Sequence, residues 1–183
     1  MIGNVVSRRY AAALFSIGKE VGIEELERYG ASLSALGEAV EKTPKLAEAF
    51  RNPVLSSEEK KKVVLSLLDV AGGGTVEQRF CALLADKDRL SLLPAIAADF
   101  GVLLDDVRGI SRGVVTTAVE LDEEHMDAIR TKLESQTGRK LVLEYVIDPS
   151  IIGGIVLRVG DSVYDASLRA QLDNLRESIK RGE

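Results

Sequence analysis

Apolar residues recur at intervals of three and four through the first part of the chain, up to about residue 107. These intervals place the apolar side chains on one face of a helix, so the pattern predicts amphipathic helices. Six such segments follow one another, with short polar, Gly- or Pro-containing breaks between them. We therefore expect residues 1–107 to form a six-helix bundle.

Two boundaries of these helices carry specific signals. Ser56 and Glu59 have the spacing of a capping box, in which each side chain binds the other residue's backbone N–H. The sixth helix is expected to begin near Ser91, because Pro94 is tolerated only in a first turn.

The period changes near residue 108. The stretches GVVTTAVEL (113–121) and LVLEYVI (141–147) are rich in β-branched residues and predict strands. Asp122 can cap a helix between them, and two further strands flank a Gly160-Asp161 hairpin turn before a final helix. The prediction for residues 108–183 is β-α-β-β-β-α, which makes the chain mainly α with a small α+β second domain.

The final helix carries one apolar stripe, made of Leu168, Leu172, Leu175 and Ile179. Part of this stripe is expected to fold back on the sheet. Residues 105–113 hold two Asp and two Gly and are the predicted hinge between the domains.

Composition narrows the class of protein. The 183 residues are 45% hydrophobic, enough for a buried core, and the net charge of −5 disfavours nucleic acid as a partner. One Cys excludes an intramolecular disulfide and suits a reducing compartment. No apolar run approaches the roughly 20 residues that span a bilayer. We expect a cytoplasmic protein without membrane insertion.

Few residues could carry chemistry. A zinc site needs several His or Cys ligands, and the chain offers only His125 and Cys81. Cys81 lies in an apolar helical segment without a recognisable base, which is typical of packing. We therefore predict no catalytic residue, no metal and no cofactor.

The stretch DPSIIGGIVLRVGD (148–161) is the most unusual motif. It is defined by Asp148, Pro149, Gly153, Gly154, Gly160 and Asp161. Glycine pairs can cradle phosphates, but this pair leads into a strand and lacks the Lys and hydroxyl of a phosphate loop. The preferred interpretation is backbone geometry, a bend or a close approach of another segment. Ile151 and Ile152 would then anchor the turn in the core.

The first and fifth helices are apolar around more of their circumference than one buried face requires. Such helices are usually buried on two sides, so we expect a groove between them that fits an amphipathic helix. The predicted contact residues are Tyr10, Ala13, Leu14, Ile17, Val76, Phe80 and Leu83.

The chain resembles a known family along nearly its whole length. VIDPSIIGGIVLRVGDSVYDASLRAQLDNLR (146–176) is similar to the C-terminal signature of the delta subunit of F-type ATP synthases, relatives of the oligomycin-sensitivity-conferring protein. RRYAAALFSIGKEVG (8–22) and RNPVLSSEEKKKVV (51–64) resemble that family's first helix and its Asn-Pro turn. RFCALLADKDRLSLLPAIAADFGVLLDD (79–106) and RGVVTTAVELDEE (112–124) are similar to the following segments.

This resemblance implies a non-catalytic part of the peripheral stalk, one copy per complex. Residues 1–107 would bind the N-terminal helix of an alpha subunit through the first and fifth helices. Residues 108–183 would bind the b subunits, at the cytoplasmic face of a bacterial plasma membrane. Two alternatives stay open, a small phosphate- or nucleotide-binding enzyme that uses Gly153-Gly154 and an unrelated two-domain adaptor.

Overall fold

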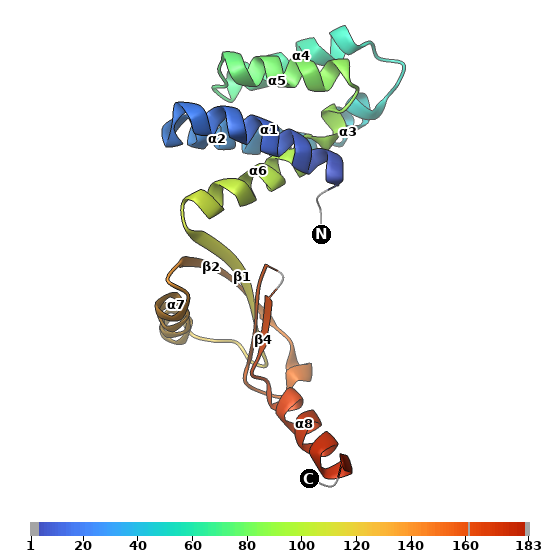
Figure 1. The fold of residues 1–183 in the computed structure, drawn as a ribbon. Helices are drawn as coiled ribbons and strands as arrows, with labels where there is room; N and C mark the ends of the chain where they lie inside the picture. Colours follow the sequence, from blue (N-terminus) through green and yellow to red (C-terminus); the bar gives the residue numbers. More distant parts are fainter. Residues whose placement is uncertain (1–3, 161, 182–183) are drawn as a thin grey trace. The chain divides into compact units, whose positions relative to one another are not determined.

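The computed structural model describes residues 4–160 and 162–181 and divides into two compact units, Met1–Asp105 and Asp106–Glu183 (Figure 1). Within the described residues there are eight α-helices and one four-stranded sheet, which lies in the second unit. The expected class, mainly helical with a small sheet near the C-terminus, is confirmed. The boundary lies close to the predicted one at residues 107 and 108, and independent folding of the two units stays a prediction.

The first unit is built from helices alone. They are α1 (Val5–Val21), α2 (Ile23–Lys42), α3 (Pro44–Arg51), α4 (Ser57–Val70), α5 (Thr75–Asp86) and α6 (Leu93–Val107), with a short 3-10 turn η1 (Leu90–Leu92) before α6. Helix α6 begins two residues after Ser91, because the chain first makes the 3-10 turn, and Pro94 lies in its first turn as expected. The predicted capping box of α4 is present, with both reciprocal bonds between Ser56 and Glu59.

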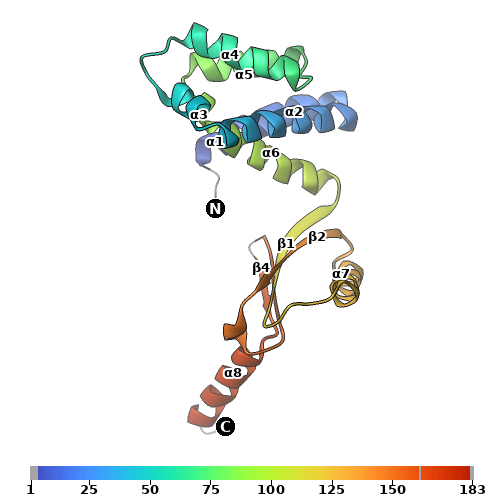
Figure 2. The same cartoon turned by 180° about the vertical axis from the view of Figure 1, so that it is seen from behind.

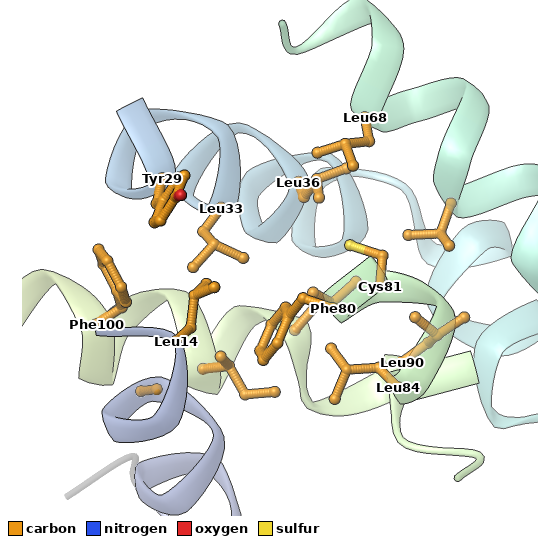
Figure 3. Packing of buried hydrophobic residues seen from close by; sticks show 14 of the residues in the cluster. Leu14, Tyr29, Leu33, Leu36, Leu68, Phe80, Cys81, Leu84, Leu90 and Phe100 are labelled. Atoms are coloured by element: carbon orange, nitrogen blue, oxygen red, sulfur yellow. The ribbon is translucent and has the colours of Figure 1, made fainter. Parts of the chain in front are cut away.

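One hydrophobic core holds these helices together (Figure 3). Its fully buried members include Leu14 of α1, Tyr29, Leu33 and Leu36 of α2, Leu68 of α4, Cys81 and Leu84 of α5, and Phe100 of α6. Each buried aliphatic or aromatic side chain contributes about 1.5–3 kcal/mol of transfer free energy. The short α3 adds Phe50, so every helix of the bundle supplies a buried residue, and this core holds α1 and α5 in one bundle.

The second unit has a mixed sheet. Its elements are β1 (Ile110–Thr117), α7 (Glu123–Thr137), β2 (Lys140–Ile147), the 3-10 turn η2 (Pro149–Ile151), β3 (Ile155–Val159), β4 (Ser162–Asp165) and α8 (Leu168–Arg181). The strand order is β2-β1-β3-β4, with β1 parallel to β2 and the other pairs antiparallel. Helix α7 makes the crossover between the parallel strands and packs against β2 (Figure 2).

The first strand is placed differently from the expectation for residues 113–121. It pairs with β2 from Ile110 to Thr117 and then stops, since β2 offers no partner beyond Ile147. The Thr117 hydroxyl donates to the Val119 carbonyl at 2.8 Å and turns the chain. The predicted hinge at 105–113 is therefore mostly regular structure, and only Arg108-Gly109 lies between α6 and β1.

Part of the apolar stripe of α8 was expected to fold back on the sheet, and this is wrong. The helix contacts η2 and extends away from the sheet (Figure 1). Its apolar stripe is exposed, from 46% at Leu168 to 69% at Ile179. The hydrogen bond from the Leu168 N–H to the Gly153 carbonyl, at 2.9 Å, fixes the start of the helix at the turn. The stripe is thus an apolar surface that the chain itself leaves to water.

We predict that trypsin cuts first after Arg108, because this exposed residue lies in the short break between α6 and β1. Limited proteolysis followed by mass spectrometry should give a helical fragment ending at Arg108. Arg108→Gln should abolish that cut while leaving helix content unchanged. First cleavage inside a helix or strand, or a chain that resists until it unfolds as one unit, would contradict the two-unit arrangement.

Candidate functional site

A groove lies between α1 and α5 on the surface of the first unit, with a volume of about 670 Å³. The seven residues expected to contact a partner all line it: Tyr10, Ala13, Leu14, Ile17, Val76, Phe80 and Leu83. The lining is completed by Val6, Arg9, Arg79 and Arg89. The structure therefore brings the whole predicted set together at one site, which we call the α1/α5 groove.

The floor of the groove belongs to the core and its rims do not. Leu14 and Phe80 are only 1% and 8% exposed, whereas Ile17 and Leu83 are 49% and 45% exposed. The Tyr10 ring packs edge-on against Phe80, with centroids 6.2 Å apart. A second helix laid between the rims would remove apolar surface from water without disturbing the floor.

The sequence pattern explains why α1 has two apolar faces. Its inner face is closed by small or apolar residues that are fully buried, Ser7, Ala11, Leu14 and Gly18. Tyr10, Ala13 and Ile17 point to another side of the same helix, at the groove. Helix α5 divides its residues in the same way, with Cys81 and Leu84 buried inside and Val76 and Leu83 at the groove.

Three arginines stand at the groove, and sequence reasoning missed them. Arg9 and Arg79 directly precede Tyr10 and Phe80, and Arg89 follows α5. The Arg89 guanidinium lies 5.5 Å from the centre of the Tyr10 ring. The signal was available for two of them, because Arg9 is four residues before Ala13 and Arg79 is four residues before Leu83, spacings that share one helix face.

The described residues offer little for catalysis. Burial raises the pKa of the Cys81 thiol to about 12, so at neutral pH it is a protonated packing group. His125 is exposed and lies next to Asp122, the residue that caps α7. In residues 4–160 and 162–181 no cluster of three or more His, Cys, Asp or Glu could bind a metal ion, and no helix there is suited in length and apolarity to span a membrane.

The glycine turn serves a close approach of two backbone segments. Gly154 has φ of +81°, and a Cβ at this position would lie 2.3 Å from the Ala166 carbonyl oxygen. At Gly153 an added Cβ would meet Leu168 Cδ1 at 2.9 Å. The chain that enters α8 therefore fills the space beside the glycine pair, which leaves no cradle for a phosphate.

The other residues of this motif shape the turn. The Asp148 carboxylate accepts the Ser150 N–H at 2.9 Å, and hydrogen bonding from Ser150 holds the pKa of Asp148 below its usual value. Pro149 opens the 3-10 turn and Ile151 is buried, as expected. Ile152 was expected in the core and this is wrong: it is 61% exposed with φ of +70°, because the 3-10 turn directs only Ile151 inward.

Of the two predicted turn residues between β3 and β4, only Gly160 lies within the described residues. Gly160 has φ of +57°, as a glycine-first hairpin turn requires, and a Cβ there would meet nothing within 4 Å. Asp161, the other predicted residue of this turn, lies outside the described residues.

Comparison with known proteins decides the family. The model of the ATP synthase delta (OSCP) subunit family matches residues 6–179. The chain belongs to that family. It is 51% identical over 183 residues to the ATP synthase subunit delta of Oleidesulfovibrio alaskensis and 48% identical over 182 residues to that of Maridesulfovibrio salexigens, each alignment covering 100% of both chains.

A solved structure agrees on the fold. A chain of the Toxoplasma gondii mitochondrial ATP synthase hexamer superimposes with a TM-score of 0.72 at 21% identity, covering 96% of this chain and 98% of that one. As a delta (OSCP) family member the chain is a non-catalytic subunit with a stator role in ATP synthesis and ion transport. The alternatives of a small enzyme and of an unrelated adaptor are set aside.

We predict that Gly154→Ala costs roughly 3 kcal/mol of the second unit's unfolding free energy, through both backbone strain and the clash with Ala166. Gly160→Ala is the matched control, because it shares the positive φ but has open space, and it should cost roughly 1 kcal/mol. The measurement is the urea dependence of hydrogen exchange at β1 and β3 amides. Equal losses in the two variants would show that close approach at Gly154 is unimportant.

Proposed function

We propose that this stator subunit holds the ATP synthase head through the α1/α5 groove, which takes the amphipathic N-terminal helix of an alpha subunit. The observation that carries the proposal is the convergence of seven apolar or aromatic residues, from two helices far apart in sequence, on one groove. The stretch of α1 from Val6 to Ile17 is about 16 Å long at 1.5 Å per residue, which matches about three turns of a bound helix.

The groove has the features of a helix-binding surface. Its floor is continuous with a rigid core, so binding would not require the bundle to rearrange. Ala13, exposed on α1, would let a bound helix approach closely, and Tyr10 offers a ring packed on Phe80 with a polar tip. Ile17 and Leu83 would lose their remaining exposure on binding, which is the driving force.

We further propose that the second unit binds the b subunits through α8, at the cytoplasmic face of a bacterial plasma membrane, with one copy per complex. The stripe on α8 has spacings of four, three and four residues, the a and d positions of a heptad. All four of its residues are exposed in the chain alone. Such a stripe fits a left-handed coiled coil with one or two partner helices.

Two contacts at separate units suit a stator. The head exerts torque while ion flow turns the central rotor, and a single contact would act as a pivot. With the groove on one unit and α8 on the other, the subunit would resist that torque through two attachments. Neither contact needs a nucleophile, a metal or a cofactor.

The groove proposal predicts that Ala13→Asp and Leu83→Asp each weaken binding of the cognate alpha N-terminal peptide by more than about 2 kcal/mol, roughly 30-fold, because each places a charge against an apolar ligand. Isothermal titration calorimetry on the full chain measures this. Both positions are exposed, so helix content should stay unchanged.

The matched control is Val70→Asp, which alters an apolar residue that is 89% exposed on the same bundle but does not line the groove. This variant should bind the peptide as the parent does. Folded Ala13→Asp and Leu83→Asp variants with parental affinity would place the alpha contact elsewhere.

The α8 proposal predicts that a double variant, Leu172→Asp with Leu175→Asp, loses binding to the soluble part of the b subunits and keeps binding to the alpha peptide. The residues are 56% and 57% exposed, so their replacement should not unfold the second unit. Asn174→Asp adds a charge on the same helix outside the stripe and is the control. Undiminished b binding by the double variant in analytical ultracentrifugation would exclude α8 as the contact.

A further inference from the structure

The α1/α5 groove carries a positive charge that nothing in the groove balances. Three of its lining residues are Arg9, Arg79 and Arg89, and none of the lining residues is Asp or Glu. In the described part of the chain these three guanidinium groups form no ion pair with a carboxylate. The whole chain has a net charge of −5, so this cluster runs against the overall charge.

The position of Arg89 is fixed by the end of α5. Asp88 adopts φ of +53° and donates its N–H to the Ala85 carbonyl, while the Arg89 N–H donates to the Leu84 carbonyl at 2.8 Å. This is the hydrogen-bond pattern of a Schellman motif, which is usually formed with glycine. The Lys60 ammonium, with its side chain only 2% exposed, pairs with Asp88 at 2.5 Å and holds this turn.

Arg89 is therefore preorganised at the groove, because both its backbone and its guanidinium are held by contacts within the chain. Its backbone is held by the helix end, and its guanidinium lies over the Tyr10 ring at 5.5 Å. It is only half-buried, so part of the guanidinium still faces water. A group held in place before binding loses less conformational entropy when a partner arrives.

A bound helix would change the environment of all three arginines. An apolar helix of sufficient length would cover the groove and strip water from guanidinium groups that have no counterion. Carboxylates beside the apolar stripe of that helix would replace the lost water with charge-assisted hydrogen bonds. Basic side chains in the same places would add like-charge repulsion.

We propose that the α1/α5 groove selects an amphipathic helix whose apolar stripe is flanked by acidic side chains, and that Arg9, Arg79 and Arg89 determine this specificity. The proposal rests on the proposed function of the groove as a helix-binding site and names the chemistry of its ligand. It requires acidic residues beside the apolar stripe in the N-terminal helix of the alpha subunit that this chain binds.

The test uses three synthetic helical peptides with one common apolar stripe of Leu and Ile, flanked by Glu, by Gln or by Lys. At low ionic strength the full chain should bind the Glu peptide roughly ten-fold more tightly than the Gln peptide and the Lys peptide least, given about two- to three-fold for each exposed charge pair. Raising the ionic strength to about 0.5 M should largely remove the difference, because salt screens exposed charges.

Variants assign the effect to the three arginines. Arg9→Gln, Arg79→Gln and Arg89→Gln combined should abolish the preference for Glu over Gln while the Gln peptide still binds. Arg8→Gln is the control, since Arg8 is an exposed arginine on the same helix that does not line the groove, and it should keep the preference. Arg89→Lys should keep only part of the contribution of Arg89, because an ammonium lacks the planar stacking on Tyr10.

The outcomes separate this proposal from the one on which it rests. Equal binding of all three peptides, abolished by Leu83→Asp, would leave the groove as a helix site and overturn the charge selectivity. A preference for Glu that survives in the triple Gln variant would also overturn it. If no peptide binds, and the alpha peptide binds equally to Leu83→Asp and to the parent, the function proposed for the groove itself fails.

Discussion

A single packing constraint underlies the first unit. Helices α1 and α5 are each apolar on two sides, and a bundle of six short helices can bury only one side of each. Leu14 of α1 and Leu84 of α5 are fully buried in the core, which fixes both helices. Ile17 and Leu83, on the same helices, are then left nearly half exposed at the groove. The α1/α5 groove is therefore a direct result of how these two helices pack in the core.

The second unit repeats this arrangement in another form. The Gly153-Gly154 turn lets the chain before α8 pass against it, and the Leu168 N–H to Gly153 carbonyl bond ties the helix to the turn. Helix α8 then presents its stripe without any cover from the sheet. Each unit thus buries apolar side chains in its own interior and leaves a second apolar surface exposed.

The sequence allowed prediction of much of the fold and of the groove, because each depends on local patterns. Capping residues such as Ser56 mark a helix start, and helices that are apolar almost all round indicate burial on two sides. Neither signal depends on contacts distant in sequence. For this reason the exposed apolar faces of α1 and α5 could be predicted from the sequence, whereas the pairing of these two helices was implied by the resemblance to the delta family.

What sequence reasoning missed depends on tertiary arrangement. The stripe of α8 looks the same whether a sheet or a partner covers it, so its exposure could not be read from periodicity. Ile152 is exposed because a 3-10 turn, not its hydrophobicity, sets its direction. The position of Arg89 at the groove follows from the turn after α5, in which Asp88 has φ of +53°, a conformation that composition does not reveal.

The proposed attachment to the ATP synthase head depends on a helix that binds in the α1/α5 groove. Hydrogen–deuterium exchange of the full chain, with and without saturating alpha N-terminal peptide, tests it most directly because it reports on every helix at once. A helix bound in the groove should slow exchange mainly in Val5–Val21 and Thr75–Asp86 and leave α3 and the second unit unchanged. Protection on α2, α4 or the second unit, with α1 and α5 unaffected, would contradict it.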